Sequence, residues 1–156
     1  MQRKLQRLLP EKLDWNRAEI ASGKMFGTEM KIIGHGIDLV SIPRIREILS
    51  GASDHFEKRV FSENEQNYCR ARKDPMPHFA ARFAAKEAYG KALGLGLGPS
   101  GEFAEIEVVN GEDGRPALRL TGKALEIFSK NGCVEAFLSL SHEGDQAIAS
   151  VILTGK

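Results

Sequence analysis

Residues 79–93, FAARFAAKEAYGKAL, predict a long helix that carries a carboxylate between basic side chains. At 3.6 residues per turn, Glu87 and Lys91 stack one above the other, and Phe83 lies one turn before Glu87. Three further side chains fall on an adjacent face: Arg82, Lys86 and Tyr89. A carboxylate beside apolar groups is costly to desolvate without a bound cation or a basic partner. Taken alone, this stretch favours a solvated ion pair between Glu87 and Lys91 over a binding site.

The composition predicts one compact domain in a reducing compartment. With 156 residues and 42% hydrophobic content, the chain can bury a real core. A net charge of +1 argues against general binding to nucleic acid, so any anion site is local. Cys69 and Cys133 lack metal-ligand spacing, which indicates reduced thiols and a cytoplasmic protein. No apolar run approaches about 20 residues and no signal peptide is recognisable, so we expect no membrane partner.

A strand-like run begins immediately after Met30, and the segment before it differs in character. Residues 1–29 are polar and basic early on, with a weak helical stripe of leucines that Pro10 would interrupt. Two hypotheses stay open: Met30 is the natural start of translation, or residues 1–29 form a short accessory arm. We expect an extension over 1–29 that is dispensable for chemistry and a domain over 30–156.

Caps and breakers predict five helices. Pro43 suits the first turn of a helix that Gly51 stops, and Ser62 with Glu65 forms a capping box. The expected helices span residues 43–49, 53 or 54 to 60, 62–72, 79–93 and 121–130, and Asn131-Gly132 closes the last.

Hydrophobic patterns predict five strands. Gly34 and Gly36 loosen a buried strand over residues 31–40. Asp113-Gly114 is a type I′ turn signal within a hairpin, and the HEGD segment joins the last two strands. The expected strands span residues 31–40, 103–109, 116–120, 134–141 and 146–153. The order of strand, several helices, two strands, helix and two strands indicates an α+β fold.

Asp38 is an isolated carboxylate near the end of an otherwise apolar strand. It either faces water at an edge or needs a ligand or partner, and the strand does not decide between these alternatives. Together, Asp38 and Glu87 could offer two hard oxygens to Mg²⁺. The countercharge for a polyphosphate would come from Arg82, Lys86 and Lys91. The GLGLG run, residues 94–98, could bring backbone N–H groups to it, although it is not a Walker loop.

Ser141-His142 is a second candidate for contact with a phosphorylated ligand. A hydroxyl, an imidazole and exposed amides at a strand end could hold a phosphate monoester, although an isolated Ser-His is more often a plain turn. No Gly-x-Ser-x-Gly elbow is present, which argues against a hydrolase triad. Gly114-Arg115-Pro116 taken alone indicates only hairpin chemistry, and His35 is as readily a packing residue as a ligand.

Five segments in order closely resemble the bacterial holo-acyl-carrier-protein synthases, the small group of the 4′-phosphopantetheinyl transferases. These segments are GHGIDLVSIPRI (34–45), FSENEQNYC (61–69), HFAARFAAKEAYGKALGLGLG (78–98), DGRPALRL (113–120) and LSLSHEGDQAIASVIL (138–153). Each is weak alone, but the ordered set is specific and runs from about Met30 to the C-terminus. The resemblance implies an α+β fold in which a small antiparallel sheet packs with a long central helix and several shorter helices.

The resemblance also implies roles for individual residues. Asp38 and Glu87 match the two magnesium-binding acids, so the implied cofactor is Mg²⁺. Lys91 matches the lysine on the coenzyme A pyrophosphate, and Lys86 matches the basic residue paired with the metal-binding glutamate. The remaining coenzyme A contacts are Ser141 and His142 near the 3′-phosphate, Arg82 in the same binding stretch, and Gly114 and Pro116 near the adenine and ribose. Arg44 matches a residue that docks the acidic carrier protein, with Arg46 assisting.

The implied reaction moves the 4′-phosphopantetheine arm of coenzyme A to a serine of apo-acyl carrier protein and releases adenosine 3′,5′-bisphosphate. The general base is either Glu87 or a water on the metal, and a lowered pKa of Glu87 as a ligand would favour the water. The resemblance further implies a homotrimer with sites at subunit interfaces. Leu97 and Glu143 depart from the usual pattern, which bears on affinity and carrier choice. The alternative is a non-catalytic coenzyme A or nucleotide binder of the same fold.

Overall fold

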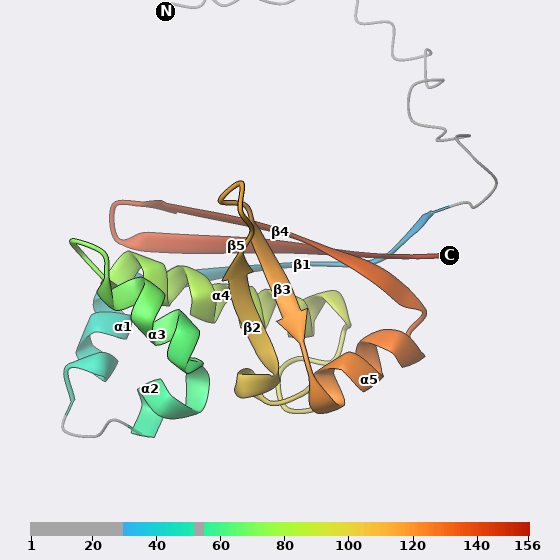
Figure 1. Cartoon of the computed structure of the whole chain (residues 1–156), viewed down its shortest axis with the longest axis horizontal. Helices are drawn as coiled ribbons and strands as arrows, with labels where there is room; N and C mark the ends of the chain where they lie inside the picture. The colour runs from blue at the N-terminus through green and yellow to red at the C-terminus, as the bar shows by residue number, and fades with distance from the viewer. Residues whose placement is uncertain (1–29, 52–54) are drawn as a thin grey trace, which may run out of the picture.

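The computed structural model describes residues 30–51 and 55–156, which form an α+β domain around one three-stranded antiparallel sheet (Figure 1). The strands are β1 (Lys31–Ser41), β5 (Gln146–Gly155) and β4 (Cys133–Glu143), in the order β1-β5-β4. The long helix α4 (Met76–Ala92) packs on one face of this sheet. The predicted fold class is confirmed. The predictions for residues 1–29 and for a cap at 53 or 54 lie outside the described residues.

The shorter helices lie on the same side of the sheet as α4 (Figure 1), and a two-stranded hairpin packs against β4. These elements are α1 (Ile42–Leu49), α2 (His55–Val60), α3 (Glu63–Arg70), the 3₁₀ turn η3 (Phe103–Glu105), the hairpin strands β2 (Ile106–Asn110) and β3 (Pro116–Leu120), and α5 (Gly122–Lys130). No helix in the described part of the chain is long and apolar enough to cross a membrane.

Two glycines of β1 let helix α4 lie directly against the strand. A Cβ atom at Gly34 would overlap the carbonyl oxygen of Ala92, and one at Gly36 would overlap that of Ala88. The helix meets the strand with fully buried alanines, so no long side chain separates the two backbones. Because side chains alternate along a strand, Asp38 shares the helix-facing side with Gly36. The close packing therefore presents Asp38 to α4.

The capping box predicted at the start of α3 is confirmed. The Glu65 amide lies 3.2 Å from Ser62 Oγ, and the Ser62 amide lies 2.9 Å from Glu65 Oε2. The helix ends at Arg70 rather than at Arg72, because the last amides close a turn onto nearby carbonyls. Its predicted end was therefore two residues too late.

The β2–β3 hairpin is present, but its turn differs from the predicted type I′ turn. Asn110 pairs with Pro116, which leaves residues 111–115 as a loop of five residues. Gly114 has a φ of 80°, and the Asn110 side-chain amide donates to its carbonyl oxygen at 3.1 Å. The loop is longer than a two-residue type I′ turn, and the hydrogen bond from the Asn110 side chain helps to close it. Residues 103–105 form the 3₁₀ turn, so β2 begins later than predicted.

Ser141 and His142 lie inside β4 rather than in the turn that follows it. The strand continues to Glu143, which pairs with Gln146, so only two residues make the turn. Neighbouring side chains of a strand point to opposite faces, so those of Ser141 and His142 leave this edge strand on different sides. The strand end predicted at Ser141 was therefore two residues too early.

Candidate active site

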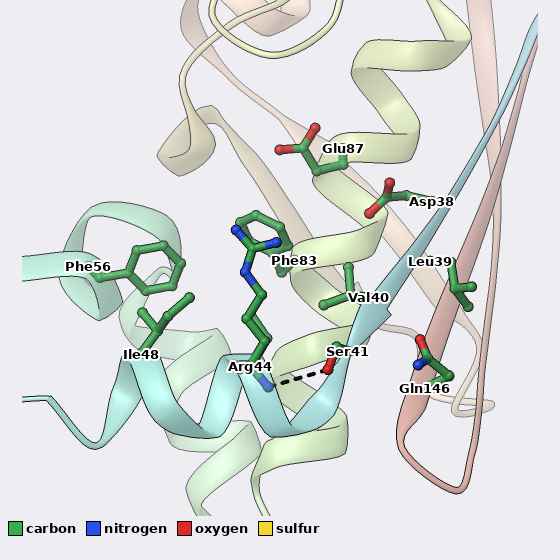
Figure 2. A pocket seen from close by; sticks show the side chains of 11 residues that line it. Asp38, Leu39, Val40, Ser41, Arg44, Ile48, Phe56, Phe83, Glu87 and Gln146 are labelled. Atoms are coloured by element: carbon green, nitrogen blue, oxygen red, sulfur yellow. Dashed lines mark hydrogen bonds between the residues drawn. The ribbon is translucent and has the colours of Figure 1, made fainter.

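Asp38 and Glu87 converge on one cavity of about 500 Å³, although they are far apart in sequence (Figure 2). Asp38 reaches it from β1 and Glu87 from α4. The carboxylates lie at one end of the cavity, and the apolar side chains of Ile48 and Phe56 lie at the other (Figure 2). The remaining lining residues are Leu39, Val40, Ser41, Arg44, Ile45, Phe83 and Gln146. The chain thus places two carboxylates beside a partly apolar space.

At this end of the cavity, Asp38 has a basic partner, whereas Glu87 has none among the described residues. Lys91 Nζ lies 2.7 Å from Asp38 Oδ1, and the lysine side chain is 51% exposed. Within the described residues, Glu87 makes no hydrogen bond or ion pair. Burial raises the pKa of Glu87, the charge of Asp38 adds to the increase, and the Lys91 ammonium opposes it. Lys91 therefore bonds to Asp38 of the strand, and the Glu87–Lys91 ion pair that the helix favours when taken alone is not formed.

A second cavity, of about 180 Å³, brings together four of the predicted coenzyme-binding residues: Arg82, Pro116, Ser141 and His142. Arg82 is 3% exposed, and its Nη2 donates to Asn110 Oδ1 at 3.0 Å. The same asparagine holds the carbonyl of Gly114, which places this turn beside the cavity. Residues from α4, the hairpin and β4 thus meet in one place, as the sequence analysis predicted.

The second cavity also holds residues that sequence reasoning missed. The ring of Tyr68 lies 4.2 Å from the Arg72 guanidinium carbon and 3.9 Å from that of Arg82. His78 lies between Tyr68 and His142, with ring centroids 6.0 and 5.9 Å away. The spacing of His78 and Arg82, one helical turn apart, was the available signal.

Cationic and polar groups gather at this cavity, and none of the described residues that line it is acidic. Burial lowers the pKa of His78, and the charges of Arg82, Arg72 and His142 lower it further. Arg82 Nε is buried and has no hydrogen-bond partner in the described part of the chain. A buried donor without an acceptor is costly, so this arrangement fits a ligand that supplies negative charge.

Comparison with known proteins identifies the family. Residues 34–151 match the model of the 4'-phosphopantetheinyl transferase superfamily. The chain belongs to this family. Curated relatives include the holo-[acyl-carrier-protein] synthases of Syntrophotalea carbinolica, 46% identical, and Syntrophus aciditrophicus, 51% identical. Each match spans 122 residues, 78% of this chain and 95% of the relative. The predicted resemblance is confirmed, and the chain is a phosphopantetheinyl transferase.

Solved structures of holo-[acyl-carrier-protein] synthases share the fold. The enzyme from Neisseria meningitidis superimposes with a TM-score of 0.73 at 29% identity, covering 79% of this chain and 98% of that one. The enzyme from Bacillus anthracis, in complex with CoA (3',5'-ADP), gives a TM-score of 0.66 at 36% identity, covering 82% and 100%.

In this transferase, Asp38 and Glu87 suit Mg²⁺ better than a softer metal. The described residues contain no group of three or more His, Cys, Asp or Glu side chains placed to hold a metal ion. Magnesium commonly takes one or two carboxylates and completes its octahedron with water and substrate phosphate oxygens. Glu87 also lacks a basic partner of its own among the described side chains, so its charge remains available to a cation. The donor set therefore fits Mg²⁺.

Lys86 does not face the coenzyme, which corrects the role that the resemblance implied. Its side chain is fully buried, and its ammonium donates to Glu65 Oε2 at 2.7 Å. It also donates to the carbonyl oxygens of Val60 at 2.7 Å and Phe103 at 3.0 Å, so all three protons are used. Burial lowers the pKa of Lys86, and the charge of Glu65 opposes the shift. Its partner is Glu65, not Glu87, and it has no surface for a ligand.

The two arginines predicted to dock the carrier protein differ in their surroundings. Arg44 extends from α1 into the first cavity (Figure 2). Its guanidinium has no ion pair with any residue of the described ranges. Arg46 instead donates to both oxygens of Asp74, at 3.2 and 3.0 Å. Arg44 is thus the better placed of the two to meet an outside anion.

Proposed function

We propose that this transferase moves the 4′-phosphopantetheine arm of coenzyme A to a serine of apo-acyl carrier protein with the help of Mg²⁺. The convergence of Asp38 and Glu87 on one cavity, with Lys91 beside them, carries this proposal. A non-catalytic binder has little use for a paired carboxylate site. The curated relatives are holo-[acyl-carrier-protein] synthases, which supports the carrier as acceptor, and the CoA complex of the Bacillus anthracis enzyme supports the donor.

The two cavities suit different parts of the coenzyme. Asp38 and Glu87 would hold Mg²⁺, which would neutralise negative charge on the reacting phosphates. Lys91 would add a positive charge at the same phosphates. The cationic second cavity, with Arg82 and His142, suits the 3′-phosphate, and the hairpin turn suits the adenosine. Arg44 would meet the acidic carrier beside the attacking serine.

The covalent change is a phosphoryl transfer. The serine oxygen forms a bond to the phosphorus that bears pantetheine, and the bridging P–O bond to the adenylate side breaks. The electron pair and the negative charge go to the leaving adenosine 3′,5′-bisphosphate. Glu87 faces the cavity without a hydrogen-bond partner among the described residues, so it is placed to take the serine proton directly or through a water.

The uncovered face of the sheet supports the homotrimer that the resemblance implies. This face carries three rows across β4, β5 and β1: Phe137, Ile152 and His35; Ser139, Ser150 and Ile37; Ser141, Ile148 and Leu39. Leu39 is 60% and Phe137 is 48% exposed. An exposed apolar face of this kind marks an interface. Ser141 lies on it, so this residue would serve a site shared with a neighbouring subunit. Light scattering would test the trimer, and a monomer at micromolar concentration would exclude it.

The buried free thiols agree with a cytoplasmic enzyme. Cys69 and Cys133 are both unpaired and buried. Burial raises the pKa of Cys69 to about 12, so this thiol stays protonated and unreactive. Neither thiol is paired, which suits a reducing compartment.

Incubation with apo-carrier protein, coenzyme A and Mg²⁺ tests the proposed function. The carrier should gain the mass of one phosphopantetheine unit, and adenosine 3′,5′-bisphosphate should appear in equal amount. Binding of coenzyme A without any change in carrier mass would favour the non-catalytic binder. Intact-mass detection of both products separates these outcomes.

Charge reversal at Arg44 should weaken carrier recognition. For Arg44→Glu we expect the KM for the carrier to rise about tenfold or more, because a rim charge that met the acidic partner would now repel it. The KM for coenzyme A should change less than about threefold. Steady-state kinetics with each substrate varied separately measures both values. Lys130→Glu, which makes the same charge change at the end of α5, is the matched control, and an Arg44→Glu enzyme with an unchanged carrier KM would exclude the docking role.

Truncation of His142 should weaken binding of the 3′-phosphate. For His142→Ala we expect the KM for coenzyme A to rise about tenfold, because a charge-assisted hydrogen bond to the phosphate is lost. The KM for 3′-dephospho-coenzyme A should hardly change. The ratio of the two KM values is the measurement, and an equal rise for both substrates would place the 3′-phosphate elsewhere.

A further inference from the structure

The Lys91 ammonium lies against Asp38, one of the two proposed metal ligands, where a metal ion would otherwise bind. Glu87 and Lys91 have the spacing that ordinarily forms an ion pair along a helix. Instead Lys91 Nζ reaches across to β1 and lies 2.7 Å from Asp38 Oδ1. Glu87 is left without a basic partner among the described side chains. Lys91 therefore pairs with Asp38 of β1 rather than with Glu87 of its own helix.

The charges of the three side chains require the Lys91–Asp38 pairing to change when a divalent cation binds. Asp38, Glu87 and Lys91 together carry one net negative charge. A divalent cation neutralises both carboxylates, which leaves the ammonium without an anion and next to a like charge. Asp38 is only 14% exposed, so there is little room for an ammonium and a hydrated ion on the same oxygen. Lys91 is half exposed on a flexible stem and is free to move away.

We propose that Lys91 is an exchangeable cation, which pairs with Asp38 until the metal binds and then turns to the phosphates of coenzyme A. This inference rests on the proposed metal site and concerns the order and coupling of binding at that site. Without coenzyme A, Lys91 competes with the metal for Asp38. With coenzyme A, its ammonium has a phosphate to bind, and the competition ends. Metal and coenzyme A therefore strengthen each other's binding through this side chain, and linkage requires the effect to be reciprocal.

Mn²⁺ binding followed by electron paramagnetic resonance tests the proposal without catalysis. In the absence of coenzyme A, Lys91→Gln should bind Mn²⁺ about fivefold more tightly than the native protein, because its competitor is gone. In the presence of coenzyme A, the affinity for Mn²⁺ should rise in both proteins, because the phosphates offer oxygens to the ion, and the rise should be about fivefold larger in the native protein than in Lys91→Gln. Removal of the Lys91 side chain should thus tighten Mn²⁺ binding in the absence of coenzyme A and no longer tighten it in its presence.

Two further variants control for charge and folding. Lys91→Arg keeps a cation that reaches Asp38, so it should bind Mn²⁺ as the native protein does in the absence of coenzyme A. Lys130→Gln makes the same charge change at an exposed site on α5, where the lysine is 76% exposed, and it should leave both affinities unchanged. A general loss of positive charge would instead tighten Mn²⁺ binding equally in Lys91→Gln and Lys130→Gln.

The outcomes separate this proposal from the proposed function. If Lys91→Gln binds Mn²⁺ no more tightly than the native protein without coenzyme A, the exchange is wrong and the metal site stands. If Lys91→Gln keeps the full enhancement by coenzyme A, the coupling does not pass through Lys91 and the proposal fails. If the native protein binds no Mn²⁺ with or without coenzyme A, the metal site itself fails.

Discussion

Replacing Asp38 by Asn is expected to lower kcat/KM for phosphopantetheine transfer by about a thousandfold or more. The change removes one of two proposed metal ligands and its charge, while the side chain keeps its shape. The amide oxygen introduced by Asp38→Asn could still accept a hydrogen bond from Lys91, so the fold should be little affected. Initial rates of carrier modification at saturating Mg²⁺, with mass detection of the product, give the value.

The effect should be specific to the carboxylate in the cavity. Asp145→Asn, at an exposed position in the β4–β5 turn and outside both cavities, makes the same chemical change and should retain activity within about twofold. Mn²⁺ affinity of Asp38→Asn should fall along with the rate. A nearly normal rate in Asp38→Asn would show that the reaction does not depend on this ligand, and the proposed mechanism would have to be abandoned.

Replacing Lys86 by Met is expected to destabilise the fold by about 3–5 kcal/mol, because the carboxylate of Glu65 would remain buried without its cation. Glu65 is 1% exposed and also accepts hydrogen bonds from the amides of Val108 and Ser62. The lost contacts join α2, α3, α4 and η3, so the damage should be global. Urea denaturation of the purified variant measures the free energy of unfolding.

A second substitution tests whether the unpaired charge is the cause. Lys86→Met with Glu65→Gln removes both charges and leaves an amide that still accepts a hydrogen bond, so it should recover at least half of the lost stability. Lys130→Met, at an exposed lysine, should change the unfolding free energy by less than about 0.5 kcal/mol. A Lys86→Met variant as stable as the native protein would mean that the buried pair is dispensable.

Local sequence patterns were sufficient to predict the helices and strands and part of the candidate site. The capping box of Ser62 and Glu65 depends on four consecutive residues, and the structure has it as predicted. The long helix follows from an uninterrupted helical pattern, and the structure extends it to begin at Met76. The meeting of Asp38 with Glu87 was predicted from the chemistry of Mg²⁺ and the family resemblance. The sequence pattern alone left Asp38 undecided.

The predictions failed where contacts between residues far apart in sequence determine the partner of a side chain. Helix periodicity gives the face on which Lys86 lies but not its partner, and Glu65 comes from another helix. The same holds for Lys91, whose nearest acid in sequence is not the acid that it binds. Tyr68 was missed because its stacking against Arg82 depends on the packing of α3 on α4. Such contacts require the tertiary arrangement, which no local rule supplies.

The absence of side chains at Gly34 and Gly36 limits which substitutions this enzyme can accept between β1 and α4. The gap between β1 and α4 sets how far apart the two carboxylates stand, and an octahedral ion with short metal–oxygen bonds tolerates little variation in that gap. A methyl group at Gly36 would overlap the carbonyl oxygen of Ala88, so it would push α4 away from β1 and move Glu87 relative to Asp38. The ion preference of the proposed metal site would thus depend partly on how closely these two backbones pack.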